Sequence, residues 1–425
     1  MLKIEDEKQF VKLVRACINA IGTPKPGPIG EPLVAWSSYG ISATVLGRKG
    51  VDAFEKLVQH LGNSYVEGKP AKQIYALKTL RAKAQELISD VVNHYNRYAT
   101  KEQVRVAIGE WALNFHPDLP SAFYYAPIIN LKLTEPLAIG KVILYPASTA
   151  LVDEIVHNTP DILKKRVTEL FSPKNCDTIA KVPLCVDETL GHELCVSYTE
   201  QALNVLRYYG YFLYSRPEQA YIGIQGHLSK VNFSILHHIP GKKAGLSYRR
   251  TGPLAPYDLS GENLEQIRKG GLDFLSTLLA NDEPNEVEAA LLGAIEWAGR
   301  ASQSLKPEAR YLNFWVAIEL LLTCDADKRR QDATLGSLIA ARASRILPFV
   351  NEEERDKARN YWNNKLYKVR CDLVHRGRSE DLADHLPKLE SYGPIVIMSY
   401  IKKLMSGSAP SSKDVFLSQL DADTL

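Results

Sequence analysis

One short stretch of the chain, LYKVRCDLVHRGR at residues 366–378, gathers side chains whose types suit chemistry on a phosphate. Arg370 and His375 stand in it with four residues between them. A histidine changes its charge near neutral pH, so it can serve as a general base or a general acid. An arginine presents a planar guanidinium that can bind two oxygens of one phosphate group. The pair therefore offers proton transfer beside an anion clamp.

The neighbours of this pair extend the candidate site. Asp372 lies three residues before His375 on the same side of a helix, where its carboxylate can orient the imidazole. An ion pair of Asp372 with Arg376 or a nearby lysine is an equal alternative. Further candidates for contact with a substrate are Tyr367, Lys368, Arg376 and Arg378. The ordinary alternative for Arg370 and His375 is that they cap helix carbonyls and point into solvent.

Helix geometry limits how Arg370 and His375 can meet. Positions five apart lie about 140° apart around a regular helix of roughly 3.6 residues per turn. The two side chains therefore cannot point in one direction from such a helix. Either the helix distorts before Gly377, or facing copies of two chains assemble the site about a two-fold axis.

The elements that must hold these residues are helical. Residues 284–405 show no strand signal and divide into five helical pieces. The most uniformly apolar piece, ARYLNFWVAIELLLT, is predicted to be the central helix, and its single acid in the apolar run is Glu319. We expect an antiparallel all-α bundle over 284–405, followed by a flexible or partner-binding tail at 406–425.

The rest of the chain predicts an α+β multidomain protein. Residues 1–116 read as a mostly helical N-terminal domain, with one helix over about 5–21 and a second marked by apolar residues from Ile74 to Tyr95. Residues 117–283 read as an α+β middle domain with one long helix, TEQALNVLRYYGYFLY, whose aromatic residues we expect in the core. The strand candidates are IINLKLTEP, AIGKVILYP, KVPLCV, HELCVSY, YIGIQG and VNFSILHH.

Composition excludes several classes of protein. The sequence is 45% hydrophobic and 24% charged, and it has no apolar run of the roughly 20 residues that span a bilayer. Its N-terminus carries acids where a signal peptide would be basic. The six cysteines form no CxxC, and the HExxH spacing that starts at His192 fails because Val196 occupies its fifth position. We therefore expect a cytoplasmic protein with no metal and no cofactor.

The motif at residues 370–377, RCDLVHRG, resembles the hallmark of the ApeA-like branch of the HEPN superfamily, R-S-x-I-V-H-x-G. Cys371 replaces the small polar residue after the arginine. Upstream, WVAIELLL resembles the apolar helix of the family that bears one acid, here Glu319, and AARASRIL resembles the arginine-containing helix that follows it. The resemblance covers roughly residues 284–405 in the order of the family.

This resemblance implies a metal-independent endoribonuclease that dimerises through its bundle, each subunit contributing one arginine and one histidine to a shared cleft. Arg370 would clamp the phosphate, His375 would transfer a proton and Asp372 would support it. Cleavage through the 2′-hydroxyl of RNA would leave a 2′,3′-cyclic phosphate and a 5′-hydroxyl. Proteins of the family often act as toxins or in defence against phage. The N-terminal domains would sense a trigger or bind a partner protein.

Two alternatives accompany this interpretation. Glu319 is expected to form an ion pair with Arg342 or Arg345 of the next helix rather than to take part in catalysis. The bundle could also be a non-catalytic HEPN module that dimerises, recognises nucleic acid or a nucleotide, and recruits a partner.

Overall fold

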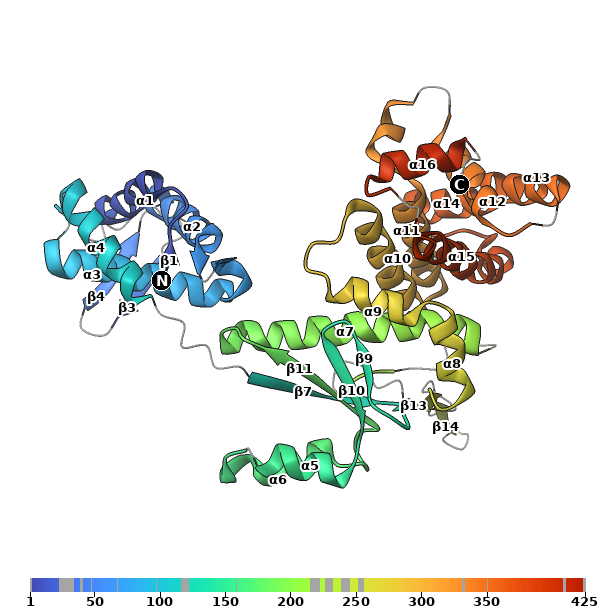
Figure 1. Ribbon diagram of the computed structural model, residues 1–425, viewed down its shortest axis with the longest axis horizontal. Coiled ribbons are helices and arrows are strands. Elements are labelled where there is room, and N and C mark those ends of the chain that lie inside the picture. Colours follow the sequence, from blue (N-terminus) through green and yellow to red (C-terminus); the bar gives the residue numbers. More distant parts are fainter. Residues whose placement is uncertain are drawn as a thin grey trace. The chain divides into compact units, whose positions relative to one another are not determined.

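Helices make up most of this α+β protein, and short strands gather mainly in the middle of the chain (Figure 1). The computed structural model describes residues 2–22, 34–38, 41–46, 48–66, 68–96, 98–115, 122–157, 159–214, 222–225, 232–237, 245–250, 256–330, 333–349, 351–407 and 410–422. They form two compact units, Met1–Tyr124 with Pro183–Leu194, and Tyr125–Val182 with Cys195–Leu425. The predicted fold class is confirmed.

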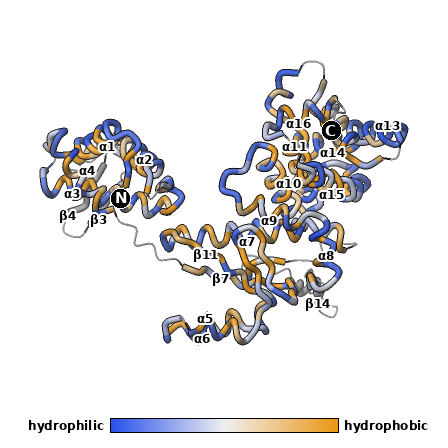
Figure 2. Tube along the Cα trace, viewed as in Figure 1, coloured by the Kyte–Doolittle hydropathy of each residue, from blue (hydrophilic) through white to orange (hydrophobic). Residues whose placement is uncertain are grey.

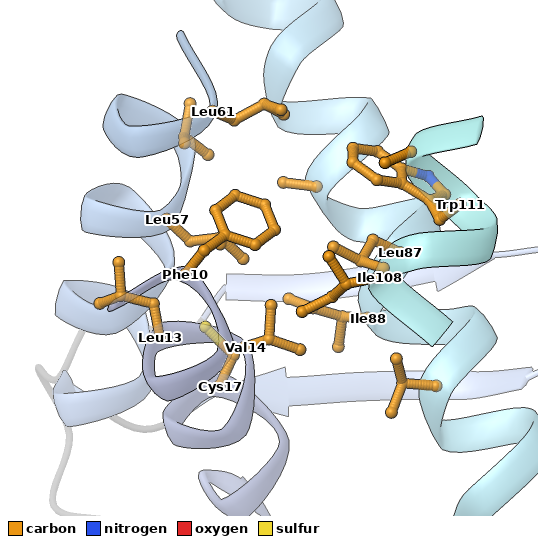
Figure 3. Packing of buried hydrophobic residues seen from close by; sticks show 14 of the residues in the cluster. Phe10, Leu13, Val14, Cys17, Leu57, Leu61, Leu87, Ile88, Ile108 and Trp111 are labelled. Atoms are coloured by element: carbon orange, nitrogen blue, oxygen red, sulfur yellow. The ribbon is translucent and has the colours of Figure 1, made fainter. Parts of the chain in front are cut away.

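The first unit is built on four helices. They are α1 (Glu7–Asn19), α2 (Arg48–Asn63), α3 (Leu77–Tyr95) and α4 (Lys101–Asn114). The apolar periodicity predicted α1 and α3, while α2 and α4 were not predicted individually. The side chain of Asp6 caps α1 by accepting a hydrogen bond from the Gln9 N–H at 3.0 Å. Figure 3 shows the apolar side chains of the four helices meeting in one core, with Phe10, Leu57, Leu87 and Ile108 among them.

Short strands complete the first unit, and the sequence did not predict them. They are β1 (Leu2–Lys3), β2 (Ile21–Gly22), β3 (Val34–Ser38), β4 (Ile41–Leu46), β5 (Tyr65–Val66) and β6 (Lys69–Pro70). They form two three-stranded sheets with the orders β1-β5-β6 and β2-β4-β3. Strands of two residues are too short to show an alternation of apolar and polar residues, so four of these six strands carry no recognisable pattern.

The middle of the chain contains a five-stranded sheet with the order β12-β7-β11-β10-β9. Neighbours β10 and β11, β10 and β9, and β12 and β7 pair antiparallel. The strands of this sheet are β7 (Ala122–Ile129), β9 (Leu137–Ile139), β10 (Val142–Pro146), β11 (Thr178–Leu184) and β12 (Gly223–Ile224). Two separate pairs are formed by β13 (Asn232–His237) with β14 (Gly245–Arg250), which run antiparallel, and by β8 (Leu131–Lys132) with β15 (Tyr257–Asp258), which run parallel. In Figure 1 the sheet lies between α7 on one side and α5 and α6 on the other.

The helices of this middle region are α5 (Thr149–His157), α6 (Asp161–Phe171), α7 (Glu188–Leu213), α8 (Glu262–Lys269) and α9 (Leu272–Ala280). The prediction of a strand at HELCVSY is wrong, because this segment belongs to α7. Its buried positions, Cys195 and Thr199, continue to Ala202 at helical spacing, and this outweighs the local alternation. Tyr208 and Tyr209 of α7 are fully buried, which confirms that they belong to the core.

The C-terminal region forms the predicted helical bundle. Its helices are α10 (Glu286–Gln303), α11 (Pro307–Leu322), α12 (Leu335–Ile346), α13 (Glu352–Tyr361), α14 (Tyr367–Arg376) and α15 (Leu382–Met405). A π-helical segment, Trp362–Leu366, makes α13 and α14 continuous. Helix α11 packs against α10, α12, α14 and α15, so it is central as expected. Figure 2 shows that α13 is far more hydrophilic than α10.

The prediction of a flexible tail at 406–425 is wrong in part, because residues Lys413–Asp421 form helix α16. Phe416, Leu417 and Leu420 are buried, and the Asp421 carboxylate reaches Arg342 of α12 at 2.9 Å. The polar composition of the segment concealed these three apolar residues, whose burial holds the helix on the bundle. None of the described helices is long and apolar enough to cross a membrane.

We expect Asp421→Ala to lower the free energy of unfolding by about 2 kcal/mol. Only 2% of the Arg342 side chain is exposed, and among the described residues the change would leave its guanidinium with Asp327 as the remaining carboxylate partner. Urea unfolding of the full chain measures the effect. In the control Asp325→Ala, the lost ion pair with Lys328 is solvent-exposed, so stability should stay at the wild-type value. Equal stability of Asp421→Ala and the wild type would contradict this account of α16.

Candidate functional site

The helix that holds the candidate residues is regular where they lie. Helix α14 runs without interruption from Tyr367 to Arg376 and ends at Gly377, whose φ of 70° and ψ of 0° place it in the left-handed region. The Gly377 N–H donates to the Leu373 carbonyl at 3.1 Å, a helix end that favours glycine. The departure from α-helical geometry occurs earlier, at Trp362–Leu366. Of our two alternatives, a distortion between Arg370 and Gly377 is therefore excluded.

Arg370 is held against the central helix of the bundle. Its Nη2 lies 3.0 Å from Glu319 Oε1 of α11, and both side chains are 22% exposed. The same carboxylate oxygen accepts a hydrogen bond of 2.7 Å from Nε1 of Trp315, one turn earlier on α11. The buried indole thus fixes the carboxylate, and the carboxylate fixes the guanidinium.

The expectation that Glu319 pairs with Arg342 or Arg345 is wrong. Arg342 binds both carboxylate oxygens of Asp327, at 2.6 and 2.9 Å. Arg345 lies 3.6 Å from Asp421 of α16. Both arginines thus form ion pairs with acids that follow α11 in the chain, whereas Glu319 pairs with Arg370 of α14. Burial alone would raise the pKa of Asp327, but the hydrogen bonds from Arg342 and from the Cys324 N–H outweigh it and lower that pKa.

His375 is exposed near the end of α14. Asp372 forms an ion pair with Arg376 at 3.2 Å, which was one of its two expected roles. No hydrogen bond joins Asp372 to His375 within the described part of the chain. Val374, which precedes His375, is 51% exposed. The end of α14 therefore presents an imidazole beside an uncovered apolar side chain.

The remaining candidates divide between the surface and the interior. Lys368 and Arg378 are exposed, and Lys368 donates to Asp381 at 2.8 Å, an interaction that raises the pKa of Lys368 and lowers that of Asp381. Tyr367 instead packs inward, with its ring centroid 5.9 Å from that of Trp315. Burial raises the pKa of Tyr367, and a hydrogen bond with Cys371 raises it further. Tyr367 is thus a packing residue in the single chain.

The single chain brings together only part of the predicted site. Arg370, Glu319 and Tyr367 gather at the contact of α11 with α14, and Trp315 is the member that sequence reasoning missed. The spacing of Trp315 and Glu319, four residues apart on one helix face, was a signal that could have found it. His375 is exposed at the helix end and points away from this cluster, because α14 is regular between the two residues.

Among the described residues, no group of three or more His, Cys, Asp and Glu side chains is arranged to hold a metal ion. The chain matches no protein family model, no curated protein and no solved structure. Its function is accordingly inferred from the side chains and their geometry.

We expect a double-mutant cycle of Glu319→Gln and Arg370→Met to give a coupling energy of about 1 kcal/mol. The pair is largely shielded from solvent and anchored by Trp315, so each substitution should be less harmful in the presence of the other. Urea unfolding of the four proteins measures it. The same cycle on Glu353 and Lys357, an ion pair 2.5 Å long with side chains 77% and 72% exposed, should give a smaller coupling. Additive effects at Glu319 and Arg370 would contradict the anchoring role.

Proposed function

We propose that the protein is an endoribonuclease of the HEPN type that needs no metal ion and acts as a homodimer through its C-terminal bundle. The observation that carries the proposal is that Arg370 and His375 leave helix α14 in different directions. Arg370 is oriented from the bundle interior by Glu319, while His375 is exposed five residues further along a regular helix. In a dimer with a two-fold axis, Arg370 of one copy and His375 of the other copy can lie in the same cleft.

The surface around His375 fits contact with a second copy. Val374 leaves half of its apolar side chain exposed directly beside the imidazole. An isologous contact that includes this side chain would place two helix ends side by side, and each would contribute its own His375. The Arg370 groups would then approach the shared cleft from the two α11–α14 contacts.

The chemistry needs no further group than these two. RNA supplies its own nucleophile, the 2′-hydroxyl, so the protein must remove that proton, protonate the leaving 5′-oxygen and stabilise charge on the phosphate. His375 serves as base or acid, and Arg370 serves as the clamp. Glu319 contacts Nη2 of Arg370, and a guanidinium has five N–H donors, so donors remain for phosphate oxygens. The products are a 2′,3′-cyclic phosphate and a 5′-hydroxyl.

The neighbouring charges suit an RNA substrate. Lys368, Arg376 and Arg378 lie exposed on the same helix and its following turn. Lys368 and Arg376 are paired with Asp381 and Asp372, and Arg378 adds positive charge near His375 although the whole chain has a net charge of only +3. Asp372 acts through Arg376, its ion-pair partner. In this proposal the preceding regions select the trigger or bind a partner protein. The enzyme works in the cytoplasm, in defence against phage or as a toxin.

A second candidate function is a non-catalytic HEPN module that dimerises and binds nucleic acid or a nucleotide. The ion pair with Glu319 favours it, because the pair neutralises Arg370 in the single chain. Cys371, which stands in place of a small polar residue, favours it as well. Incubation of the purified protein with total RNA in EDTA separates the two candidates, since only the ribonuclease produces fragments.

We expect His375→Ala to lower the rate of RNA cleavage in EDTA by about 10²–10⁴-fold, the usual contribution of a general acid or base. The fold and the dimer should remain, because the imidazole is exposed. Gel analysis of RNA fragments measures the rate. As a control, His192→Ala removes another exposed histidine, in α7, and should cleave as the wild type does. Full activity of His375→Ala, or loss of wild-type activity in EDTA, would reject the proposal.

A further inference from the structure

A pocket that the proposed catalytic groups do not use opens between α13 and α15. Its volume is about 390 Å³, and its walls include three aromatic rings, those of Phe349, Tyr361 and Tyr392. Lys357 of α13 and Lys388 of α15 line it from the two helices. Ligand pockets in proteins span about 300–1,000 Å³, so this one has room for a small ring system.

The aromatic walls are held in place by neighbouring side chains. The Tyr361 hydroxyl forms a hydrogen bond of 2.6 Å with Nδ1 of His385, and burial raises the pKa of Tyr361, so the phenol stays neutral. The ring of Tyr392 lies 6.3 Å from that of Trp362, which is fully buried, with an angle of 31° between their planes. Because these contacts hold the rings of Tyr361 and Tyr392, a planar ligand would meet preformed ring faces.

Lysines lie at the pocket and along the helices toward His375, and of the two in the pocket wall Lys357 is paired with Glu353. Lys388 is exposed and takes part in no ion pair among the residues that the structure describes. Further along the same pair of helices, Lys368 binds Asp381, and Lys365 lies near enough to contribute to the lowered pKa of that carboxyl. Lys365 and Lys368 lie on the continuous helix α13–α14, between the pocket and the end of α14. The carboxylate of Glu354 also lines the pocket.

The distance between pocket and helix end suits a short piece of single strand. His375 lies fourteen positions after Tyr361 in the chain. At about 1.5 Å per residue this separation spans roughly 21 Å along the helix axis. A few extended nucleotides cover such a length, with their phosphates beside Lys365 and Lys368.

We propose that the pocket between α13 and α15 binds an unpaired nucleobase of single-stranded RNA, a few nucleotides from the phosphate on which His375 acts. The identity of the ligand follows from the rings and the lysines: bases stack on aromatic faces whatever their sequence, and lysines follow the backbone. The placement relative to the scissile phosphate rests on the proposed ribonuclease function, whereas the binding of the base does not.

Binding to the full chain that carries His375→Ala tests the pocket without cleavage. Fluorescence anisotropy with a labelled single-stranded oligoribonucleotide gives the affinity. Tyr392→Ala, added to this parent, should weaken binding about tenfold, because one stacking partner is lost. An oligoribonucleotide in which every base is removed should lose this difference. Lys402→Ala, an exposed lysine further along α15, is the control and should bind as the parent does.

Two further variants guard against misfolding. Tyr392→Phe retains the ring and should restore the affinity of the parent. Lys388→Ala changes an exposed side chain and should lower the slope of log affinity against log salt by about one. The proposal that the pocket binds a base would be overturned if the parent failed to bind RNA. It would also be overturned if the Tyr392→Ala and Lys388→Ala variants bound RNA as the parent does. If Tyr392→Ala weakens binding while the chain with His375 intact cuts no RNA, the proposal of base binding is supported and the proposal of ribonuclease activity is rejected.

Discussion

The ion pair between Glu319 of α11 and Arg370 of α14 decides which way the candidate catalytic groups face. Trp315 holds the carboxylate, so the direction of the guanidinium is set by the most buried helix of the bundle. His375 follows five residues later on a regular helix, about 140° around the axis. The packing of α14 on the bundle core therefore sets the directions of both side chains. Within one chain, Arg370 and His375 point away from each other. In the proposed dimer, a composite site between two chains would bring an arginine and a histidine together.

The π-helical segment Trp362–Leu366 keeps this long helix seated on the core. Trp362 and Leu366 are fully buried, and Val369 and Leu373 continue the buried face into α14. A wider turn changes the phase at which later side chains leave the helix, and such segments are frequent at functional sites. Here it joins the part of the helix that lines the aromatic pocket to the part that carries Arg370. The proposed base pocket and the proposed cleavage site thus depend on one continuous element.

The sequence predicted the bundle well because burial repeats regularly along its helices. It failed where a contact joins residues far apart in the chain. Two arginines on the next helix offered Glu319 an equally plausible partner, and only the fold shows that Arg342 belongs to Asp327 and Asp421. Asp421 lies in a polar segment whose three buried residues are too few to give a helical period. The split of Arg370 and His375 was expected from helix geometry, but the role of Trp315 was not.

Mixing of two inactive variants tests the composite site most directly. Arg370→Ala and His375→Ala proteins are each expected to be inactive, and random exchange of subunits would make about half of the dimers mixed. A mixed dimer retains one arginine and one histidine from different chains, so RNA cleavage in EDTA should return. A mixture that stays inactive although native mass spectrometry detects mixed dimers would contradict a site shared between chains.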